Sequence, residues 1–176
     1  AIAPILARHP GATLVCDGGE IGQWPQSLLA APRRVINGVA GSIGAAIPFG
    51  IAAREADPAN PVIVVMGDGS FGFHMAEFDT AVRYERPFVV VVGNDAGWNA
   101  EHQIQLRSYG PQRAHGCELL PTRYDQVVEA LGGHGELVET GAELGPALQR
   151  ALDSGKPACV NVMIERMAAP VVRRPA

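Results

Sequence analysis

Two acidic residues stand at the ends of two apolar runs, and their positions suggest a cation site. Asp68 lies in the turn Gly67-Asp68-Gly69-Ser70, directly after the run Pro61–Met66. Asp95 closes the turn that follows the run Phe88–Val92. Carboxylates supply the hard oxygen ligands that Mg²⁺ takes in proteins, and a glycine turn lets backbone N–H groups approach a phosphate closely. Because Asp68 would repel a bare phosphate, we expect a divalent cation between the two.

The elements that position these residues form one predicted βαβ unit. Both apolar runs are typical of buried strands, and a helix is predicted from about His74 to Tyr84, where apolar residues recur at helical spacing. Strands joined in this way lie parallel, so their carboxyl ends meet at one edge of the sheet. Open α/β sheets bind ligands at that edge, and the helix start would favour phosphate there.

The same turn also matches the dinucleotide-binding pattern G-x-G-x-x-G, as Gly67, Gly69 and Gly72. The pattern indicates a Rossmann-type nucleotide-binding module without catalysis as one alternative. Asp68 argues against it, because a dinucleotide pyrophosphate binds such a turn without a metal ion.

The turn and the later Asn94-Asp95 resemble the cofactor motif of thiamine-diphosphate enzymes, which usually ends in Asn-Asn. The resemblance implies that Mg²⁺ is held by Asp68, Asp95 and the carbonyl of Gly97. Since Asp95 replaces the family's second Asn, Asn94 stays open as the alternative metal ligand. The cofactor-binding residues implied around this motif are Gly67, Gly69, Ser70, Asn94 and Trp98.

The resemblance extends upstream to acetolactate synthases. Gly41-Ser42-Ile43-Gly44 is similar to their Gly-Thr-Met-Gly segment, whose bulky apolar residue props the cofactor into a bent V shape. This implies cofactor contacts for Gly41, Ser42 and Ile43, with core packing as the alternative for Ile43. Asp17-Gly18-Gly19-Glu20 resembles another cofactor-side segment, in which Glu20 and Ile21 replace Gln and His. Trp24 either contacts a ligand from a loop or packs internally.

The resemblance implies an acetolactate synthase-like enzyme, a lyase or transferase acting on 2-keto acids by decarboxylation and carboligation with thiamine diphosphate and Mg²⁺. The turn Gly93–Trp98 is also similar to that of 2-hydroxyacyl-CoA lyases, which changes the substrate but keeps the cofactor. In the family, the cofactor-activating glutamate belongs to the pyrimidine-binding domain of a second subunit. We therefore expect a homodimer or homotetramer and an inactive isolated chain. FAD would occupy a middle domain, as in acetolactate synthases.

Length and composition set the fold class and exclude several functions. The 176 residues, 47% of them hydrophobic, fit a single domain, 1–176, which we expect to be the C-terminal piece of a longer chain. We predict an α/β, doubly wound, mostly parallel sheet with helices on both faces, the thiamine-diphosphate-binding fold. A net charge of −4 and the lack of a long apolar run argue against nucleic acid and membrane partners. Three widely spaced cysteines indicate a reducing, cytoplasmic location.

The remaining segments alternate between predicted helices and strands. The sequence indicates helices at Ile2–His9, Tyr124–Leu131, Glu143–Ser154 and within Gly38–Ala56. Pro48 marks either a kink in the last of these or its start. Strands are predicted at Thr13–Cys16, Arg33–Asn37, Leu137-Val138 and Pro157–Ile164. From Gln103 to Pro121 no periodicity is evident, which predicts a long functional loop or lid. His102 is the histidine nearest the predicted site and either has a catalytic or substrate role or is an ordinary surface or packed residue. Residues 171–176 should fray.

Overall fold

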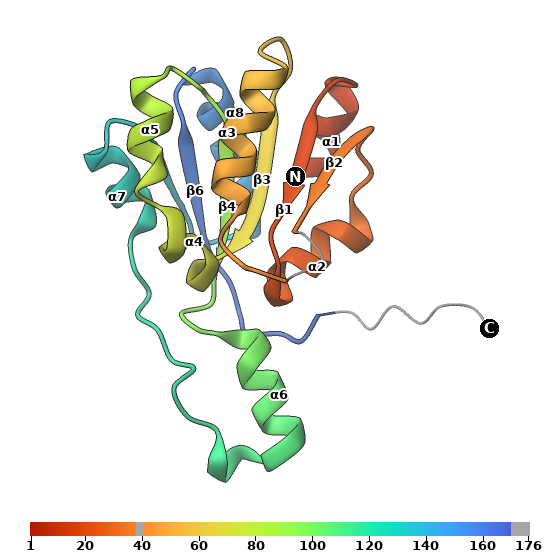
Figure 1. The fold of residues 1–176 in the computed structure, drawn as a ribbon, viewed down its shortest axis with the longest axis vertical. Helices are drawn as coiled ribbons and strands as arrows, with labels where there is room; N and C mark the ends of the chain where they lie inside the picture. Colours follow the sequence, from red (N-terminus) through yellow and green to blue (C-terminus); the bar gives the residue numbers. More distant parts are fainter. Residues whose placement is uncertain (38–40, 170–176) are drawn as a thin grey trace, which may run out of the picture.

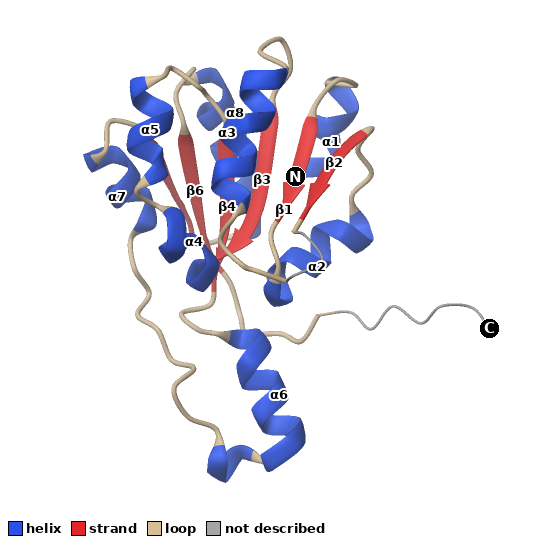
Figure 2. Cartoon of the chain, viewed as in Figure 1, coloured by secondary structure: helices blue, strands red, loops and turns tan. Residues whose placement is uncertain are grey.

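The fold is that of a computed structural model, which describes residues 1–37 and 41–169 (Figures 1 and 2). The predicted frayed tail at 171–176 lies outside these ranges. Six parallel strands form one sheet in the order β2-β1-β3-β4-β6-β5. The strands are β1 (Thr13–Cys16), β2 (Arg33–Ile36), β3 (Val62–Gly67), β4 (Val89–Asn94), β5 (His134–Val138) and β6 (Ala158–Met163).

The strand order confirms the predicted doubly wound α/β fold and places a ligand crevice. From β1 the chain goes to the outer neighbour β2, then crosses back to β3 and continues in the other direction. The order therefore reverses between β1 and β3, and such switch points leave a crevice at the carboxyl ends of the strands. Next to it, Gly67 of β3 pairs in register with Gly93 of β4, so the two predicted acidic turns lie side by side.

Helices cover both faces of the sheet, as expected (Figure 1). One apolar cluster joins alternate strand residues to α1 (Ile2–Arg8), to Ile21 of α2 (Gly19–Leu28) and to α8 (Gly141–Asp153). The cluster on the opposite face includes residues of α3 (Ala46–Ala56), α4 (Asp68–His74), α5 (Glu77–Arg83) and α7 (Tyr124–Ala130). Pro48 lies in the first turn of α3, where its missing N–H breaks no helical hydrogen bond, so it marks a start and not a kink.

The helix of the central βαβ unit begins earlier than predicted. It starts at Asp68, directly after β3, and is interrupted at Met75-Ala76 before α5. The prediction placed the start near His74 because Gly69 and Gly72 have low helix propensity. The side chain of Phe71 is fully buried against Phe78 and Tyr124, and this packing stabilises a helical turn that propensity alone does not favour.

Two predicted loops were wrong because both contain helices. The segment around Trp24 forms α2, which has Pro25 inside it and two glycines near its start. The segment predicted as a loop to Pro121 contains most of α6 (Asn99–Tyr109) and a 3₁₀ turn at Pro111–Arg113. Helix α6 projects from the carboxyl edge of the sheet, away from the other helices (Figures 1 and 2), and buries only Asn99, so it has no apolar stripe to reveal it.

Across residues 1–37 and 41–169, no helix combines the length and the apolar character that a membrane crossing requires.

Candidate cofactor and metal site

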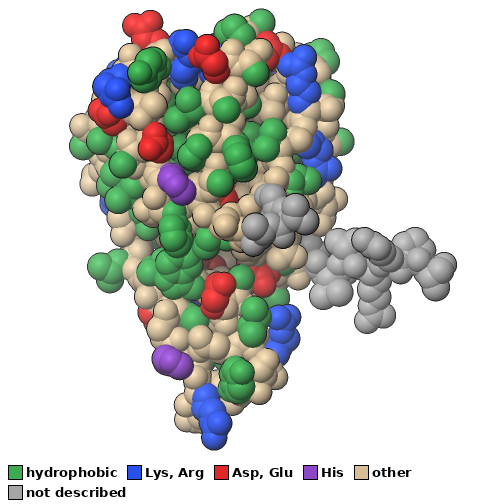
Figure 3. Space-filling view, viewed as in Figure 1, with side chains coloured by type: hydrophobic (Ala, Val, Ile, Leu, Met, Phe, Trp, Pro, Cys, Tyr) green, Lys and Arg blue, Asp and Glu red, His purple; other side chains and the backbone are tan. Residues whose placement is uncertain are grey.

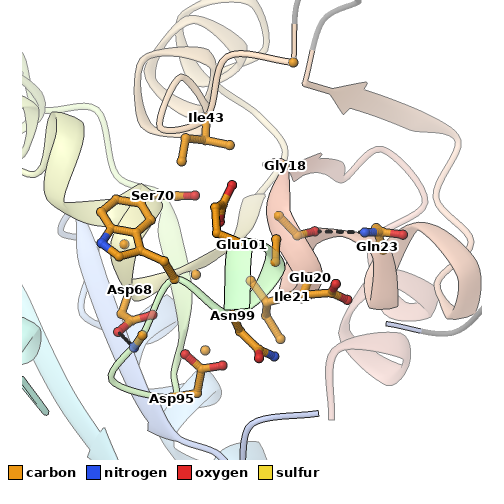
Figure 4. A pocket seen from close by; sticks show the side chains of 18 residues that line it. Gly18, Glu20, Ile21, Gln23, Ile43, Asp68, Ser70, Asp95, Asn99 and Glu101 are labelled. Carbon is orange, nitrogen blue, oxygen red and sulfur yellow. Dashed lines mark hydrogen bonds between the residues drawn. The ribbon is translucent and has the colours of Figure 1, made fainter. Parts of the chain in front are cut away.

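A cavity of about 270 Å³ opens at the carboxyl edge of the sheet, next to the switch point between β1 and β3 (Figure 4). Its walls come from the first turns of α2, α4 and α6, from the turn after β4 and from the segment before α3. The structure brings most of the predicted site residues to this cavity: Glu20, Gly41, Ile43, Gly67, Asp68, Gly69, Ser70, Asp95, Gly97 and Trp98.

Three predicted site residues do not line the cavity: Ser42, Asn94 and His102. Ser42 is exposed beside the cavity wall. His102 lies in the second turn of α6, and its buried Nδ1 has no hydrogen-bond partner among the described residues. His102 therefore does not line the cavity, and its catalytic role stays a prediction.

Asp68 and Asp95 form the acidic end of the cavity (Figure 4). Asp68 is 2% exposed, and its Oδ2 accepts a hydrogen bond of 3.1 Å from the Gly97 N–H. Burial and the nearby Asp95 raise the pKa of Asp68 to about 6. Burial also raises the pKa of Asp95, while the positive charge of Arg166 opposes that shift. Two acids with raised pKa values on one cavity form a site that a cation would stabilise.

The donor set fits a hard divalent cation. Within the described residues there is no group of three or more His, Cys, Asp or Glu side chains that could enclose a metal ion. Two carboxylates plus a backbone carbonyl leave coordination positions for phosphate oxygens and water, which is how Mg²⁺ is usually bound.

Asn94 faces the protein interior and not the cavity. Its side chain is fully buried; Nδ2 donates to the Thr122 carbonyl at 3.0 Å and to Oδ1 of Asn161 at 3.1 Å. Its Oδ1 accepts a hydrogen bond of 3.2 Å from the Ala96 N–H. Asp95, the first residue after β4, lines the cavity, and Asn94 does not. The amide of Asn94 therefore shapes the turn that carries Asp95.

Asp17 positions the cavity wall that contains Ile43. The Asp17 carboxylate is buried at the end of β1 and accepts hydrogen bonds from the N–H groups of Gly18 at 2.6 Å, Gly44 at 3.0 Å and Ala46 at 3.1 Å. These bonds tie the segment before α3 to the switch point. Ile43 is half-buried and lies across the cavity from Asp95 in Figure 4, which is not the position of a core residue.

Close packing explains two glycines of the site. A Cβ atom at Gly69 would lie 2.6 Å from the Trp98 ring, and one at Gly93 would lie 2.6 Å from the Ile21 side chain. Both distances are shorter than real Cβ contacts, so a larger residue at either position would have to displace the Trp98 ring or the Ile21 side chain. The Trp98 ring also packs edge-on against Phe73, with ring centres 5.9 Å apart.

Several cavity residues were not predicted from the sequence, including Ile21, Asn99 and Glu101. Asn99 and Glu101 belong to the first turn of α6, and no apolar periodicity indicated that a helix begins there. Ile21 was noted only as a replacement for a family histidine; in the structure it lies over the ends of β3 and β4.

Comparison with known proteins agrees with this geometry. Residues 17–162 match the family described as "Thiamine pyrophosphate enzyme, C-terminal TPP binding domain". The chain belongs to this family. The match confirms the resemblance that the turn motifs suggested, and it favours thiamine diphosphate over a dinucleotide as the cofactor.

The relatives within the family are named for different activities. The chain is 40% identical over 172 residues to a probable acetolactate synthase of Mycobacterium bovis, which aligns 96% of this chain with 31% of that protein. It is 35% identical over 172 residues to a 2-hydroxyacyl-CoA lyase of Oryza sativa subsp. japonica, aligning 93% of the chain with 30% of the relative. A sulfoacetaldehyde acetyltransferase of Alcaligenes xylosoxydans xylosoxydans is 35% identical over 140 residues, 77% of this chain and 23% of that protein. The chain thus spans less than a third of these curated relatives.

Replacing Asp68 by Asn should change how stability depends on pH. Folding raises the pKa of Asp68 from 3.8 to about 6. The Asp68 carboxyl therefore makes its full contribution to the free energy of unfolding below about pH 4, and this contribution is lost as the pH rises through about 6. The Asp68→Asn chain should therefore gain stability over wild type, by on the order of 3 kcal/mol, between about pH 4 and pH 7. Urea unfolding in EDTA measures this, and a difference that is constant with pH would contradict it.

Replacing Asn94 and Asp95 one at a time should show that Asn94 stabilises the fold and that Asp95 does not. Asn94→Ala leaves the buried groups of Asn161 and Ala96 without their partner, which should lower the free energy of unfolding by about 1–3 kcal/mol. Asp95→Ala removes one charge of a repelling pair and should not destabilise the metal-free chain. Denaturant melts of both variants check this; an Asn94→Ala chain as stable as wild type would show that the amide is not structural.

Proposed function

We propose that this chain binds the diphosphate of thiamine diphosphate through Mg²⁺, as part of an acetolactate synthase-like enzyme that acts on 2-keto acids by decarboxylation and carboligation. The observation that carries the proposal is the convergence of Asp68 and Asp95 on one cavity at the carboxyl edge. Family membership supplies the cofactor, and the pair of carboxylates supplies the reason for a metal ion.

The chain's own residues would hold and orient the cofactor. The carboxylates of Asp68 and Asp95 and the carbonyl of Gly97 would coordinate Mg²⁺, while the Gly97 N–H keeps the Asp68 carboxylate in place. The Ser70 hydroxyl at the cavity wall can donate a hydrogen bond to a phosphate oxygen. Bound thiamine diphosphate supplies the electron sink that lets a 2-keto acid lose carbon dioxide.

Ile43 would support the bent form of the cofactor. Its half-buried side chain forms the wall across the cavity from the acidic end, and Asp17 fixes the backbone directly after it. An aliphatic side chain held in this way can limit the cofactor to one conformation without any polar contact.

A second subunit should complete the active site. Phe73 is 58% exposed and forms, with Trp98 and Leu119, a shallow apolar groove beside Asp68. Hydrophobic side chains gather on this face of the molecule (Figure 3). Such patches are typical of protein interfaces, which supports docking of the pyrimidine-binding domain of a partner in a homodimer or homotetramer. We propose that the cofactor-activating glutamate comes from that domain, so the isolated chain is inactive.

The three cysteines support a reducing compartment, and we propose the cytoplasm. All three are free thiols, at Cys16, Cys117 and Cys159, and all are buried. Free buried thiols persist where thiols are kept reduced.

A second candidate keeps the same site and changes the substrate. The similarity to 2-hydroxyacyl-CoA lyases covers most of the chain and includes the turn Gly93–Trp98 that carries Asp95. Assaying the full-length enzyme with pyruvate and, separately, with a 2-hydroxyacyl-CoA distinguishes the two candidates, because the cofactor site alone is compatible with both.

Removing the metal should remove cofactor binding. Two unit charges 4 Å apart repel by about 4 kcal/mol at an effective dielectric near 20, and a dication between them reverses that sign. Thiamine diphosphate should therefore bind the full-length enzyme with Mg²⁺ and only weakly with EDTA. Asp68→Ala should lose both ligands together, and Asp95→Asn should keep binding but with altered metal preference.

Calorimetric titration of wild type and both variants, with Mg²⁺ and with EDTA, measures these affinities. A titration with NAD serves as the control for the dinucleotide alternative. Equal affinity for thiamine diphosphate with and without metal, or an Asp68→Ala enzyme that binds normally, would refute the bridging role.

A further inference from the structure

Arg166, which follows β6, lies directly against the turn that carries Asp95. Its Nε donates a hydrogen bond of 2.8 Å to the Asp95 carbonyl, and its Nη2 donates to the Ala96 carbonyl. Its Nη1 donates to Glu118 at 2.6 Å. The guanidinium also packs on Gly97, where a Cβ atom would lie 2.7 Å from Nη2. The same side chain thus contacts three successive residues of the proposed metal-binding turn.

The turn needs such restraint because its backbone is strained. Ala96 has a φ of 53°, in the left-handed region that residues with a Cβ rarely adopt. Its N–H is held by Asn94, and its carbonyl accepts hydrogen bonds from both Arg166 and the Leu119 N–H, the latter at 2.8 Å. Strained residues persist only where the surroundings over-determine them, so these bonds fix the turn.

Because Arg166 binds two of the three carbonyls in this turn, the third is left for the cation. With the Asp95 and Ala96 carbonyls bound by Arg166, the Gly97 carbonyl accepts no backbone hydrogen bond from the described residues. The Gly97 N–H meanwhile points to Asp68. The geometry leaves Gly97 as the backbone oxygen of this turn that is available to a metal ion.

We infer that Arg166 is a positioning residue for the metal site: its guanidinium fork holds the Asp95–Gly97 turn in the conformation that presents the Asp95 carboxylate and the Gly97 carbonyl to the cation. This inference rests on the proposed function, since it requires Mg²⁺ at Asp68 and Asp95. Fork geometry matters because two carbonyls and a carboxylate are bound at once, which an ammonium group on a flexible stem cannot reproduce.

The charge of Arg166 alone would act in the opposite direction. A cation close to the carboxylates competes with Mg²⁺, so a purely electrostatic Arg166 would weaken metal binding and its removal would strengthen it. Glu118 is ion-paired with Arg166 and balances its charge. A positioning role predicts weaker Mg²⁺ binding in Arg166→Gln, and a purely electrostatic role predicts tighter binding. The direction of the change therefore distinguishes the two roles.

The test uses the full-length enzyme with Arg166→Gln, Arg166→Lys and a matched control, Arg150→Gln. Arg150 also makes a two-bond contact with a carboxylate, that of Glu136, but on α8 and β5, away from the cavity. The first measurement is the Mg²⁺ concentration that gives half-maximal thiamine diphosphate binding. The second is amide hydrogen exchange of residues 95–98 in the metal-free enzyme.

Both Arg166 variants should raise the half-saturating Mg²⁺ concentration by about 10- to 100-fold, as second-layer substitutions commonly do. Exchange at 95–98 should become faster, and kcat should return toward the wild-type value at saturating Mg²⁺. Arg150→Gln should match wild type. If Arg166→Gln fails to fold, Arg166→Lys and Glu118→Gln still test the positioning role. Glu118→Gln keeps both hydrogen bonds from Arg166 to the carbonyls, so it should raise the half-saturating Mg²⁺ concentration less than Arg166→Lys does.

Unchanged Mg²⁺ dependence in the Arg166 variants, or tighter Mg²⁺ binding by Arg166→Gln, would overturn the inference while leaving the proposed function intact. A wild-type enzyme that binds thiamine diphosphate equally well in EDTA would refute the proposed function itself, and the inference with it.

Discussion

The repulsion between Asp68 and Asp95 is the constraint on which the rest of this site depends. Parallel pairing of Gly67 with Gly93 brings the two turns together, and burial of Asp68 removes the water that would screen the charges. Burial and the charge of Asp95 together raise the pKa of Asp68, and burial raises that of Asp95. A protein that keeps two such groups at the carboxyl edge of its sheet must supply compensation, from its own charges or from a bound cation.

A layer of residues that do not line the cavity holds its walls in place. Asn94 turns inward and fixes the start of the acidic turn through Asn161, while Arg166 binds the turn from its outer side. Asp17 does the same for the opposite wall by holding the backbone around Ile43. The cavity is thus shaped by buried amides, carboxylates and one guanidinium, and its ligand-facing atoms are left free to bind.

The fold and the acidic pair could be predicted because they depend on local patterns. Runs such as Pro61–Met66 indicate buried parallel strands, and a glycine turn after a strand indicates a ligand edge. Helix α6 was missed because it projects from the sheet and has no apolar stripe, and α4 because packing of Phe71 overrides its glycines. The roles of Asn94 and Arg166 depend on partners distant in the chain, which no local pattern contains.

The account is tested most directly by locating the metal. Crystals of the full-length enzyme with thiamine diphosphate and Mn²⁺ in place of Mg²⁺ would give an anomalous signal at the ion. The account predicts one ion bound by the carboxylates of Asp68 and Asp95 and by the Gly97 carbonyl, with the Asn94 amide still bonded to Asn161. An ion coordinated by Asn94, or a diphosphate bound in this cavity without a metal, would contradict it.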